Sequence, residues 1–311
     1  MKIGIDLGGT TMTVGAVSNE NEIIAKIETD TRSDDGAERI IERMAQLTQK
    51  VIRQVNDNSI THIGIGCPGM LDRENGRVIY SNNLNWHDVD INKKLMSYFD
   101  VPVYLENDAN CAALGEYKKG SGKNFNSMIM ITLGTGIGGG VIIDNKLYRG
   151  KSGNSNILGH IVINTDGELC TCGRKGCWEA YASITALIRQ AKEMAQEHKG
   201  SELFRLMERE GSLTGRSIFA AIHKGDYAAK QVFNRYIKYV SEGIIDIINI
   251  FDPQSIVIGG GISQQGEFLL KPIREIVEKN IYCGKDVMPY ITASSLGNDA
   301  GIIGASCLNE Y

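Results

Sequence analysis

Three cysteines and one histidine lie within eighteen residues of one another in this 311-residue chain. They are His160, Cys170, Cys172 and Cys177. Three thiolates and an imidazole form a closed tetrahedral zinc site, which leaves no coordination position open for catalysis. Gly173 and Gly176 permit the tight backbone that turns several sulfurs toward one ion. The spacing therefore predicts a structural Zn²⁺ that shapes a loop, and a metal-free thiol cluster or a disulfide loop is the alternative.

Length and composition restrict the class of protein. A chain of 311 residues exceeds one ordinary core, so two domains are expected. The net charge of −4 and the lack of a basic patch argue against a nucleic-acid partner. The sequence contains no long apolar run for a membrane span and no apolar signal peptide, so a cytoplasmic protein is expected. The remaining thiols are expected to be packed in the core: Cys67, Cys111, Cys283 and Cys307.

The hydrophobic pattern predicts a β-turn-β unit in each half of the chain. Strands are expected at residues 3–6, 12–17, 22–28, 63–66, 101–105, 127–132, 139–143 and 255–258. Helices are expected at residues 37–55, 91–99, 109–117, 183–198, 226–250, 266–279 and 300–308. Short turns join the first three strands, which predicts an antiparallel meander. Strand, glycine-rich turn and strand occur at 3–17 and again at 127–143, which indicates a weak internal duplication.

The first glycine-rich turn has the composition of an anion site. Gly8 and Gly9 let backbone N–H groups approach a phosphate, and Thr10 and Thr11 add hydroxyl donors. Asp6, at the end of the preceding strand, is placed to hold Mg²⁺ through water. The turn is not a dinucleotide fingerprint, because a strand and not a helix follows it. An ordinary hairpin turn is the alternative.

Two further glycine clusters follow in the second half. Residues 134–140 contain five glycines, more than a hairpin needs, so a second phosphate-binding turn around Thr135 and Gly136 is favoured over a plain loop. Gly259, Gly260 and Gly261 end an apolar strand and allow close approach of a nucleoside base or sugar. A simple turn into a helix explains this third cluster equally well.

Asp108 is the candidate general base. It follows a strand and opens a helix, where the helix dipole favours the carboxylate by about 0.3–1 kcal/mol. A carboxylate placed there can accept the proton of a substrate hydroxyl as that oxygen attacks a phosphoryl group. Helix capping by Asn107 and Asp108 is the structural alternative, and the two roles are compatible.

These motifs occur together in one known family. The chain reads Asp6-x-Gly-Gly-Thr, then Asn107-Asp-Ala-Asn, Gly134-Thr-Gly-Ile-Gly-Gly-Gly, Cys170-x-Cys-Gly-x-x-Gly-Cys-x-Glu and Phe251-Asp-Pro before Gly259-Gly-Gly. It resembles the ROK family (repressors, open reading frames and sugar kinases) over essentially its full length. The resemblance implies an α/β, actin-like and hexokinase-like (ribonuclease H-like) two-domain fold with a central cleft. The small domain would comprise residues 1–118 plus 299–311. The large domain would comprise residues 119–298 and would contain the zinc knot, which is the predicted metal-binding segment from His160 to Cys177.

The resemblance also implies residue roles. Asp108 would be the general base in ATP-dependent phosphorylation of a sugar 6-hydroxyl, and His160 would be both a zinc ligand and a neighbour of the sugar. The implied sugar neighbours are Gly69, Asn83, Asn107, Asp108, His160 and Glu179. The implied nucleotide and phosphate neighbours are Asp6, Gly8, Gly9, Thr10, Thr11, Thr135, Gly136, Gly260 and Gly261. ATP, Mg²⁺ and structural Zn²⁺ are the implied cofactors, and a homodimer is expected.

Position 157 departs from the family pattern. Members that act on free hexoses usually carry Gly-Glu-(Ile/Leu)-Gly-His before the knot, and here Ile157 replaces that glutamate. Losing a carboxylate that accepts from a sugar hydroxyl should weaken free-sugar binding by about 1.5–3 kcal/mol. An apolar Ile157, with Asn154 and Asn156 before it, suits a substrate without a free anomeric hydroxyl, such as the β-glucoside cellobiose. A glucokinase variant that contacts the ring elsewhere is an equal alternative.

Three classes of function compete. A sugar kinase acting on a β-glucoside or on glucose is favoured, with N-acetylmannosamine and allose as further open substrates. A transcriptional regulator is the second class, and a protein that senses sugar without catalysis is the third. A DNA-binding repressor of this family would carry an N-terminal helix-turn-helix domain, whereas the phosphate-loop strand here begins at Ile3. The intact Asp108 and both glycine-rich turns argue against a non-catalytic sensor.

Overall fold

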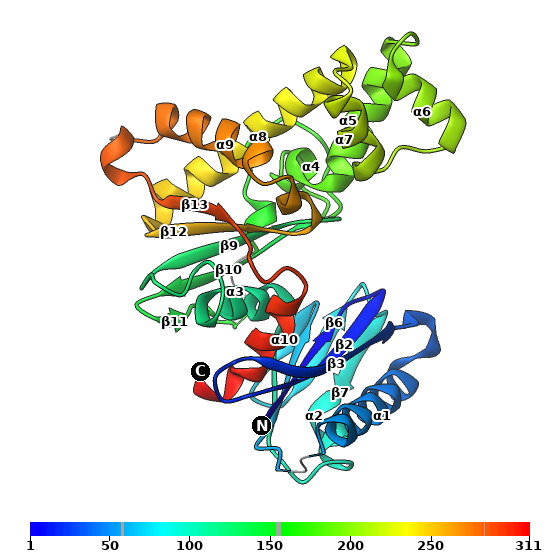
Figure 1. Ribbon diagram of the computed structural model, residues 1–311, viewed down its shortest axis with the longest axis vertical. Coiled ribbons are helices and arrows are strands. Elements are labelled where there is room, and N and C mark those ends of the chain that lie inside the picture. Colours follow the sequence, from blue (N-terminus) through cyan, green and yellow to red (C-terminus); the bar gives the residue numbers. More distant parts are fainter. Residues whose placement is uncertain (57–58, 154–156, 283) are drawn as a thin grey trace. The chain divides into compact units, whose positions relative to one another are not determined.

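The computed structural model describes residues 1–56, 59–153, 157–282 and 284–311 (Figure 1). The chain forms two compact units. The first unit comprises Met1–Met130, Gly139–Asn156 and Ser294–Tyr311, and the second comprises Ile131–Gly138 and Ile157–Ala293. Within the described ranges, no helix combines the length and apolar character required to cross a bilayer.

The first unit contains both strands and helices, and its chain begins with three consecutive strands. Its elements are β1 (Lys2–Leu7), β2 (Thr11–Val17), β3 (Ile23–Asp30), α1 (Ala37–Val55), β4 (Ile63–Cys67), β5 (Met70–Asp72), β6 (Arg77–Ser81), β7 (Trp86–Asp90), α2 (Ile91–Met96), β8 (Val103–Asn107), α3 (Asp108–Lys118), β11 (Lys146–Leu147) and α10 (Asp299–Ser306). Strands β9 (Met128–Leu133) and β10 (Ile137–Ile143) have residues in both units.

Helices dominate the second unit. Its elements are α4 (Glu179–Ala182), α5 (Ile184–Glu197), α6 (Glu202–Glu210), α7 (Gly215–His223), α8 (Tyr227–Phe251), β12 (Ser255–Gly259), α9 (Glu267–Asn280) and β13 (Tyr290–Ala293). Short 3₁₀ helices occur in both units: η1 (Ser33–Asp35) and η5 (Leu308–Glu310) in the first, and η2 (Leu158–His160), η3 (Gly261–Gln265) and η4 (Gly284–Val287) in the second.

Two five-stranded sheets repeat one topology. Their strand orders are β3-β2-β1-β4-β8 and β11-β10-β9-β12-β13. When the strands of each sheet are numbered by their order along the chain, both sheets have the order third, second, first, fourth, fifth from one edge to the other. Both sheets are mixed: β1 pairs antiparallel with β2 and parallel with β4, and β12 pairs parallel with β13. The duplication predicted from the two glycine-rich turns is therefore present in the sheet topology.

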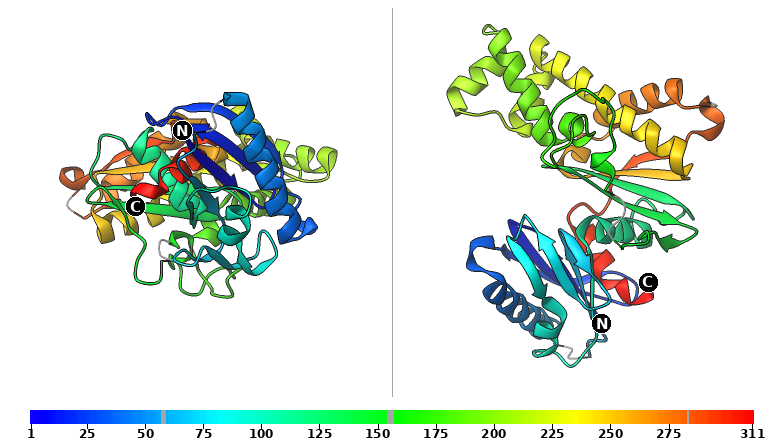
Figure 2. Two further views of the ribbon diagram at one scale, coloured as in Figure 1. Left: turned by 90° about the horizontal axis from the view of Figure 1, so that it is seen from below. Right: turned by 180° about the vertical axis from the view of Figure 1, so that it is seen from behind.

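Alternation along β1 assigns its two faces. Side chains alternate across a strand, so Ile3 and Ile5 share one face and Gly4 the other. Ile3 and Ile5 are fully buried in a cluster with Ile40 of α1. A side chain at Gly4 would collide with the Ile302 carbonyl of α10. Helix α1 thus covers one face of the first sheet and α10 approaches the other, as Figure 2 shows from two sides.

The predicted meander and helix 37–55 are confirmed, but shorter elements differ. The helix predicted at 91–99 ends at Met96, and the strand predicted at 101–105 lies at 103–107. The antiparallel sheet β5-β6-β7 was not predicted, and neither were α6, α7, β11 and β13. Strands of three to five residues with half-exposed patterns carry little periodicity of their own. The packed thiols are confirmed for Cys67, Cys111 and Cys307, whereas Cys283 lies outside the described residues.

A buried carboxylate anchors the segment that returns to the first unit. Glu116, on α3, is fully buried. Its oxygens accept hydrogen bonds from the Leu296 backbone N–H at 2.8 Å and from the Ser121 backbone N–H at 2.7 Å. The Ser294 hydroxyl donates to the same carboxylate at 2.5 Å. One side chain therefore satisfies donors from the neighbouring turn at Ser121 and from the distant segment 294–296.

We expect Glu116→Gln to lower the free energy of unfolding by about 1.5–3 kcal/mol. The variant loses the charge-assisted hydrogen bonds, and its NH₂ group cannot accept from the N–H and O–H donors that one carboxylate oxygen served. Urea unfolding measures the change. Glu38→Gln, at an exposed ion pair with Lys94, is the matched control and should stay within about 0.5 kcal/mol. Equal stability of the two variants would contradict the anchoring role.

Candidate active site and metal centre

The first glycine-rich turn joins β1 to β2. The backbone N–H of Gly8 donates to the Thr11 carbonyl at 2.9 Å, which closes the turn. The hydroxyl of Thr31 donates to the Gly8 carbonyl at 2.7 Å. A side chain at Gly9 would meet the backbone of Asn83, so two predicted site residues lie against each other. Thr31 was missed at the sequence level, since nothing in its local pattern distinguishes it.

Asn107 and Asp108 occupy the junction of β8 and α3. Asn107 is the N-cap residue, and its side-chain oxygen accepts from the backbone N–H groups of Ala109 at 3.0 Å and Asn110 at 3.3 Å. Asp108 is the first residue of the helix, and its carboxylate also accepts from the Ala109 N–H, at 2.9 Å. The capping predicted for this motif is confirmed, and it fixes where Asp108 stands.

Burial controls the ionisation of both acidic candidates. Burial raises the pKa of Asp108, and the hydrogen bonds from Ala109 and Asn107 oppose that rise only in part. The cost of removing Asp108 from water therefore outweighs the local hydrogen bonds that favour its carboxylate form. Burial, and then the Asp108 charge, raise the pKa of Asp6 to about 7. Asp6 and Asp108 are thus close enough to interact, and a bound cation would relieve their repulsion.

This pair fits a magnesium site in its donor chemistry. Mg²⁺ prefers carboxylate oxygens and keeps several waters. A side chain at Gly301 of α10 would press on the Asp6 carboxylate, so that glycine keeps the space beside Asp6 open. The remaining predicted sugar neighbour in this unit is Gly69, after β4. Its φ is 119° and an added Cβ would collide with the Tyr80 carbonyl, so only glycine is tolerated there.

The second glycine-rich turn lies between β9 and β10. The N–H of Gly134 donates to the Gly136 carbonyl at 3.0 Å. The hydroxyl of Thr185 donates to the backbone carbonyl of Thr135 at 2.7 Å, and Thr135 is an exposed residue. The N–H of Ile184 donates to the Gly134 carbonyl at 2.8 Å. These bonds hold the turn on the first turn of α5.

Two distant motifs converge on this turn. The Glu179 carboxylate accepts the backbone N–H of Ile137 at 2.8 Å, and a side chain at Gly136 would collide with that carboxylate. Gly260 has a φ of 86° and lies against the Leu133 carbonyl. Gly261 begins η3 and is open to solvent. The structure thus brings together the second turn, the glutamate after the knot and the third glycine cluster.

A cavity of about 210 Å³ opens beside these residues. Among the side chains that line it are those of Thr135, Cys170, Thr171, Glu179 and Arg189. The Thr171 hydroxyl donates to the Glu179 carboxylate at 3.4 Å. The metal cluster and the phosphate-type turn therefore border one small cavity within the second unit.

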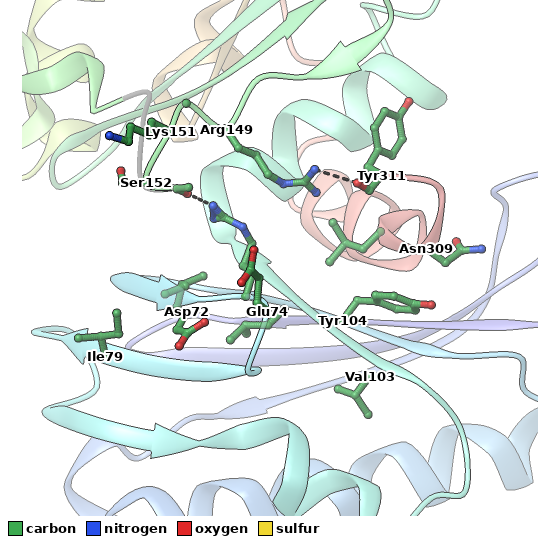
Figure 3. A pocket seen from close by; sticks show the side chains of 16 residues that line it. Asp72, Glu74, Ile79, Val103, Tyr104, Arg149, Lys151, Ser152, Asn309 and Tyr311 are labelled. Carbon is green, nitrogen blue, oxygen red and sulfur yellow. Dashed lines mark hydrogen bonds between the residues drawn. The ribbon is translucent and has the colours of Figure 1, made fainter.

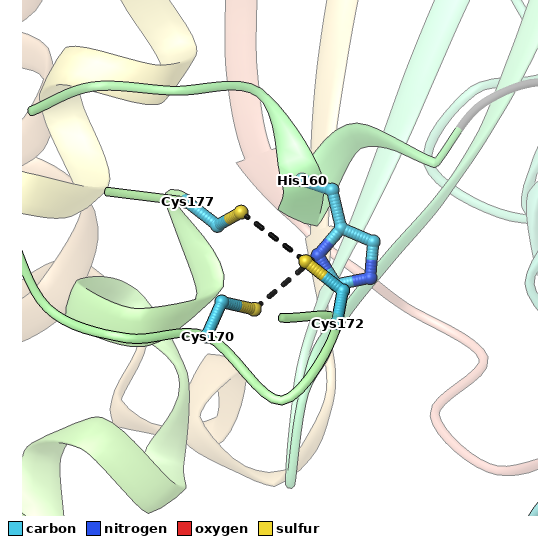
Figure 4. Close-up of side chains that lie close together, drawn as sticks. All are labelled: His160, Cys170, Cys172 and Cys177. Atoms are coloured by element: carbon cyan, nitrogen blue, oxygen red, sulfur yellow. Dashed lines mark hydrogen bonds between the residues drawn. The ribbon is translucent and has the colours of Figure 1, made fainter. Parts of the chain in front are cut away.

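The four predicted metal ligands converge (Figure 4). The ligand atoms of His160, Cys170, Cys172 and Cys177 all lie within 4.8 Å of one another. The Cys170 sulfur is 3.6 Å from His160 Nδ1, and the Cys172 and Cys177 sulfurs are 3.6 Å apart. Ligands of tetrahedral zinc stand roughly 3.8 Å apart for Zn–S bonds of about 2.3 Å. The geometry and donor set fit zinc.

The knot backbone explains this convergence. Gly173 and Gly176 have φ values of 87° and 81°, as expected for the tight wrap. A side chain at Gly176 would collide with the Asn164 carbonyl. Ile157 precedes η2, which ends at His160, and it is 60% exposed. Asn154 and Asn156, predicted to lie beside it, are outside the described residues.

Comparison with known proteins defines the family. The ROK family model matches residues 2–310. A glucokinase from Thermotoga maritima is 39% identical over 308 residues, covering 98% of this chain and 96% of that protein. The crystal structure of a ROK family glucokinase from Streptomyces griseus with glucose and AMPPNP has a TM-score of 0.84 and 36% identity, and the match covers 99% of this chain and 98% of that one. The chain belongs to the ROK family, and the predicted actin-like, hexokinase-like α/β fold is confirmed.

The family also contains regulators. A xylose repressor from Caldicellulosiruptor bescii is 29% identical over 304 residues, covering 97% of this chain but 76% of that protein. Family membership alone therefore does not separate kinases from repressors, and the chemistry of the site has to do so.

Proposed function

We propose that this protein is an ATP-dependent kinase that phosphorylates the 6-hydroxyl of a free hexose, with glucose as the first candidate. The observation that carries the proposal is the interacting carboxylate pair, with Asp6 before a Gly-Gly-Thr-Thr turn and Asp108 at a helix N-terminus. A repressor needs neither a base nor a phosphate-binding turn for sugar sensing. The full-length similarity to glucokinases supports the same function.

In this mechanism Asp108 accepts the proton of the 6-hydroxyl as that oxygen attacks the γ-phosphorus of ATP and the bond to ADP breaks. Proposed sugar ligands are Gly69, Asn83, Asn107, Ile157, His160 and Glu179. Proposed phosphate and nucleotide contacts are Asp6, Gly8, Gly9, Thr10, Thr11, Thr135, Gly136, Gly260 and Gly261. Asp6 would hold Mg²⁺, which supplies charge neutralisation at the phosphates, and the four-ligand cluster would hold structural Zn²⁺. A homodimer is part of the same proposal.

An ADP-release assay across sugars tests this function. Purified protein with ATP and Mg²⁺ is supplied in turn with glucose, cellobiose, allose and N-acetylmannosamine. Sugar-dependent ADP release with glucose is expected, with the 6-phosphate as product. If the protein binds a sugar but releases no ADP with any of the four sugars, the protein is a sugar sensor and the kinase proposal is overturned.

A β-glucoside is the second candidate substrate, and Ile157 is the observation that favours it. Ile157 is a largely exposed apolar side chain three residues before the proposed sugar neighbour His160. An apolar residue at the anomeric side leaves no carboxylate to accept from a free anomeric hydroxyl. It also tolerates the ether oxygen and aglycone of a glycoside.

If Ile157 faces the anomeric carbon, Ile157→Glu should shift the ratio of kcat/KM values toward free glucose, relative to cellobiose, by about tenfold or more. This is the effect of one charge-assisted hydrogen bond. Ile157→Leu keeps the apolar character and is the control. A wild type that phosphorylates glucose efficiently and ignores β-glucosides would remove the glycoside candidate.

A further inference from the structure

Glu106 is a buried carboxylate next to the proposed base. It lies on β8, its side chain is fully buried, and it directly precedes Asn107 and Asp108. Its Oε1 accepts the backbone N–H of Asn107 at 2.8 Å and the side-chain amide of Asn110 at 3.0 Å. Both donors belong to the junction that carries Asp108.

Two arginines from distant segments complete this network. Arg73, from the turn between β5 and β6, donates to Oε1 of Glu106 at 3.1 Å. Arg149, after β11, donates through Nε to Oε2 at 2.6 Å. Both arginine side chains are mostly buried, with exposures of 15% and 26%. Two cations thus compensate a carboxylate whose burial would otherwise be costly.

The arginines are themselves held in place. Arg73 also donates to the Gly153 carbonyl, and Arg149 donates to the main-chain oxygen of Tyr311 at 3.0 Å. Figure 3 shows Arg149 and Tyr311 joined by this bond at a cavity of about 750 Å³ in the first unit. Each arginine therefore has a backbone partner besides Glu106, so its guanidinium group cannot rotate freely.

We infer that Glu106, clamped by Arg73 and Arg149, is a positioning residue that sets the orientation of Asp108. The inference rests on the proposed function, since Asp108 is the base there. Glu106 fixes the N–H of Asn107 and the amide of Asn110, while Asn107 caps the helix turn that Asp108 begins. Loss of the clamp frees this turn to rotate, and small rotations at a base cost turnover more than binding.

An ion pair that only stabilises the fold is the competing explanation, so the test separates turnover from binding and stability. Glu106→Gln keeps the shape but removes the charge. We expect it to lower kcat at least tenfold while KM for ATP changes less than threefold, in protein that remains folded by circular dichroism at the assay temperature. Glu38→Gln makes the same chemical change at an exposed pair and should leave kcat unchanged.

Conservative rescue gives a second readout. Arg149→Lys keeps the cation and should retain most of the turnover, whereas Arg149→Met should lose about as much kcat as Glu106→Gln. Combining Glu106→Gln with Arg149→Met should add little further loss, because both break one unit. If Glu106→Gln does not fold, the comparison of Arg149→Lys with Arg149→Met tests the inference instead. The Arg149 side chain is partly exposed, so its replacement perturbs the core less.

The outcomes distinguish the two proposals. A wild type without sugar-dependent ADP release means that the kinase function has failed. A wild type that is active, a variant Asp108→Asn that is inactive, and normal kcat in folded Glu106→Gln and in Arg149→Met would overturn the positioning role alone.

Discussion

Replacing Asp108 by asparagine is expected to lower kcat at least ~10²-fold, because the 6-hydroxyl then loses its proton acceptor. Binding of sugar and ATP should change little, since asparagine keeps the size and most hydrogen bonds of the junction. Steady-state kinetics and calorimetric titration measure the two effects. The matched control is Asp144→Asn, at an exposed left-handed turn residue with φ 50°, which asparagine tolerates well. Near-normal turnover in Asp108→Asn would remove Asp108 from the mechanism.

The raised pKa of Asp108 fixes the sign of its pH dependence. Catalysis needs the carboxylate, so kcat/KM should rise with pH through a pKa above the usual aspartate value of 3.8. The contribution of Asp108 to stability has the opposite pH dependence, because the folded protein binds the proton of Asp108 more tightly than the unfolded chain does. This stabilising contribution is fully present below the pKa of Asp108 in the unfolded chain. It is lost as pH rises through the pKa of Asp108 in the folded protein. Asp108→Asn should therefore be at least as stable as the wild type at pH 8. A less stable variant would indicate a structural role for the carboxylate.

Loss of the metal is the second large effect expected. Cys172→Ser should remove bound zinc and lower the melting temperature by at least ~5 °C, because metal binding free energy is part of folding free energy. Activity should fall with it, since Glu179 follows the knot and holds the Ile137 N–H of the second turn. Elemental analysis, thermal melting and the ADP assay give the three readouts.

A thiol outside the cluster provides the control for this prediction. Cys307→Ser changes a buried cysteine of the first unit and should keep full zinc content. Purified wild-type protein without stoichiometric zinc but with full activity would show that the zinc interpretation is wrong.

Local patterns were sufficient for part of this protein. The meander, helix 37–55 and the metal ligands are each encoded within a few residues: by strand alternation, by helical periodicity, and by cysteine spacing with two glycines. The Asn107 cap is also local, because the side chain reaches backbone N–H groups only two and three residues away. The motif order was enough to indicate the family. The domain limits, the residue roles and the homodimer stay predictions.

Tertiary structure decided what depends on distant neighbours. The ionisation of Asp108 is governed by burial, which the local sequence around the helix N-terminus does not reveal. The hydrogen bond from Ile137 to Glu179 joins residues 42 positions apart, and the Arg149 clamp on Glu106 joins residues 43 apart. No periodicity encodes such pairs. Desolvation and charge pairing depend on which segments the fold brings together, and for these residues only the folded chain determines that.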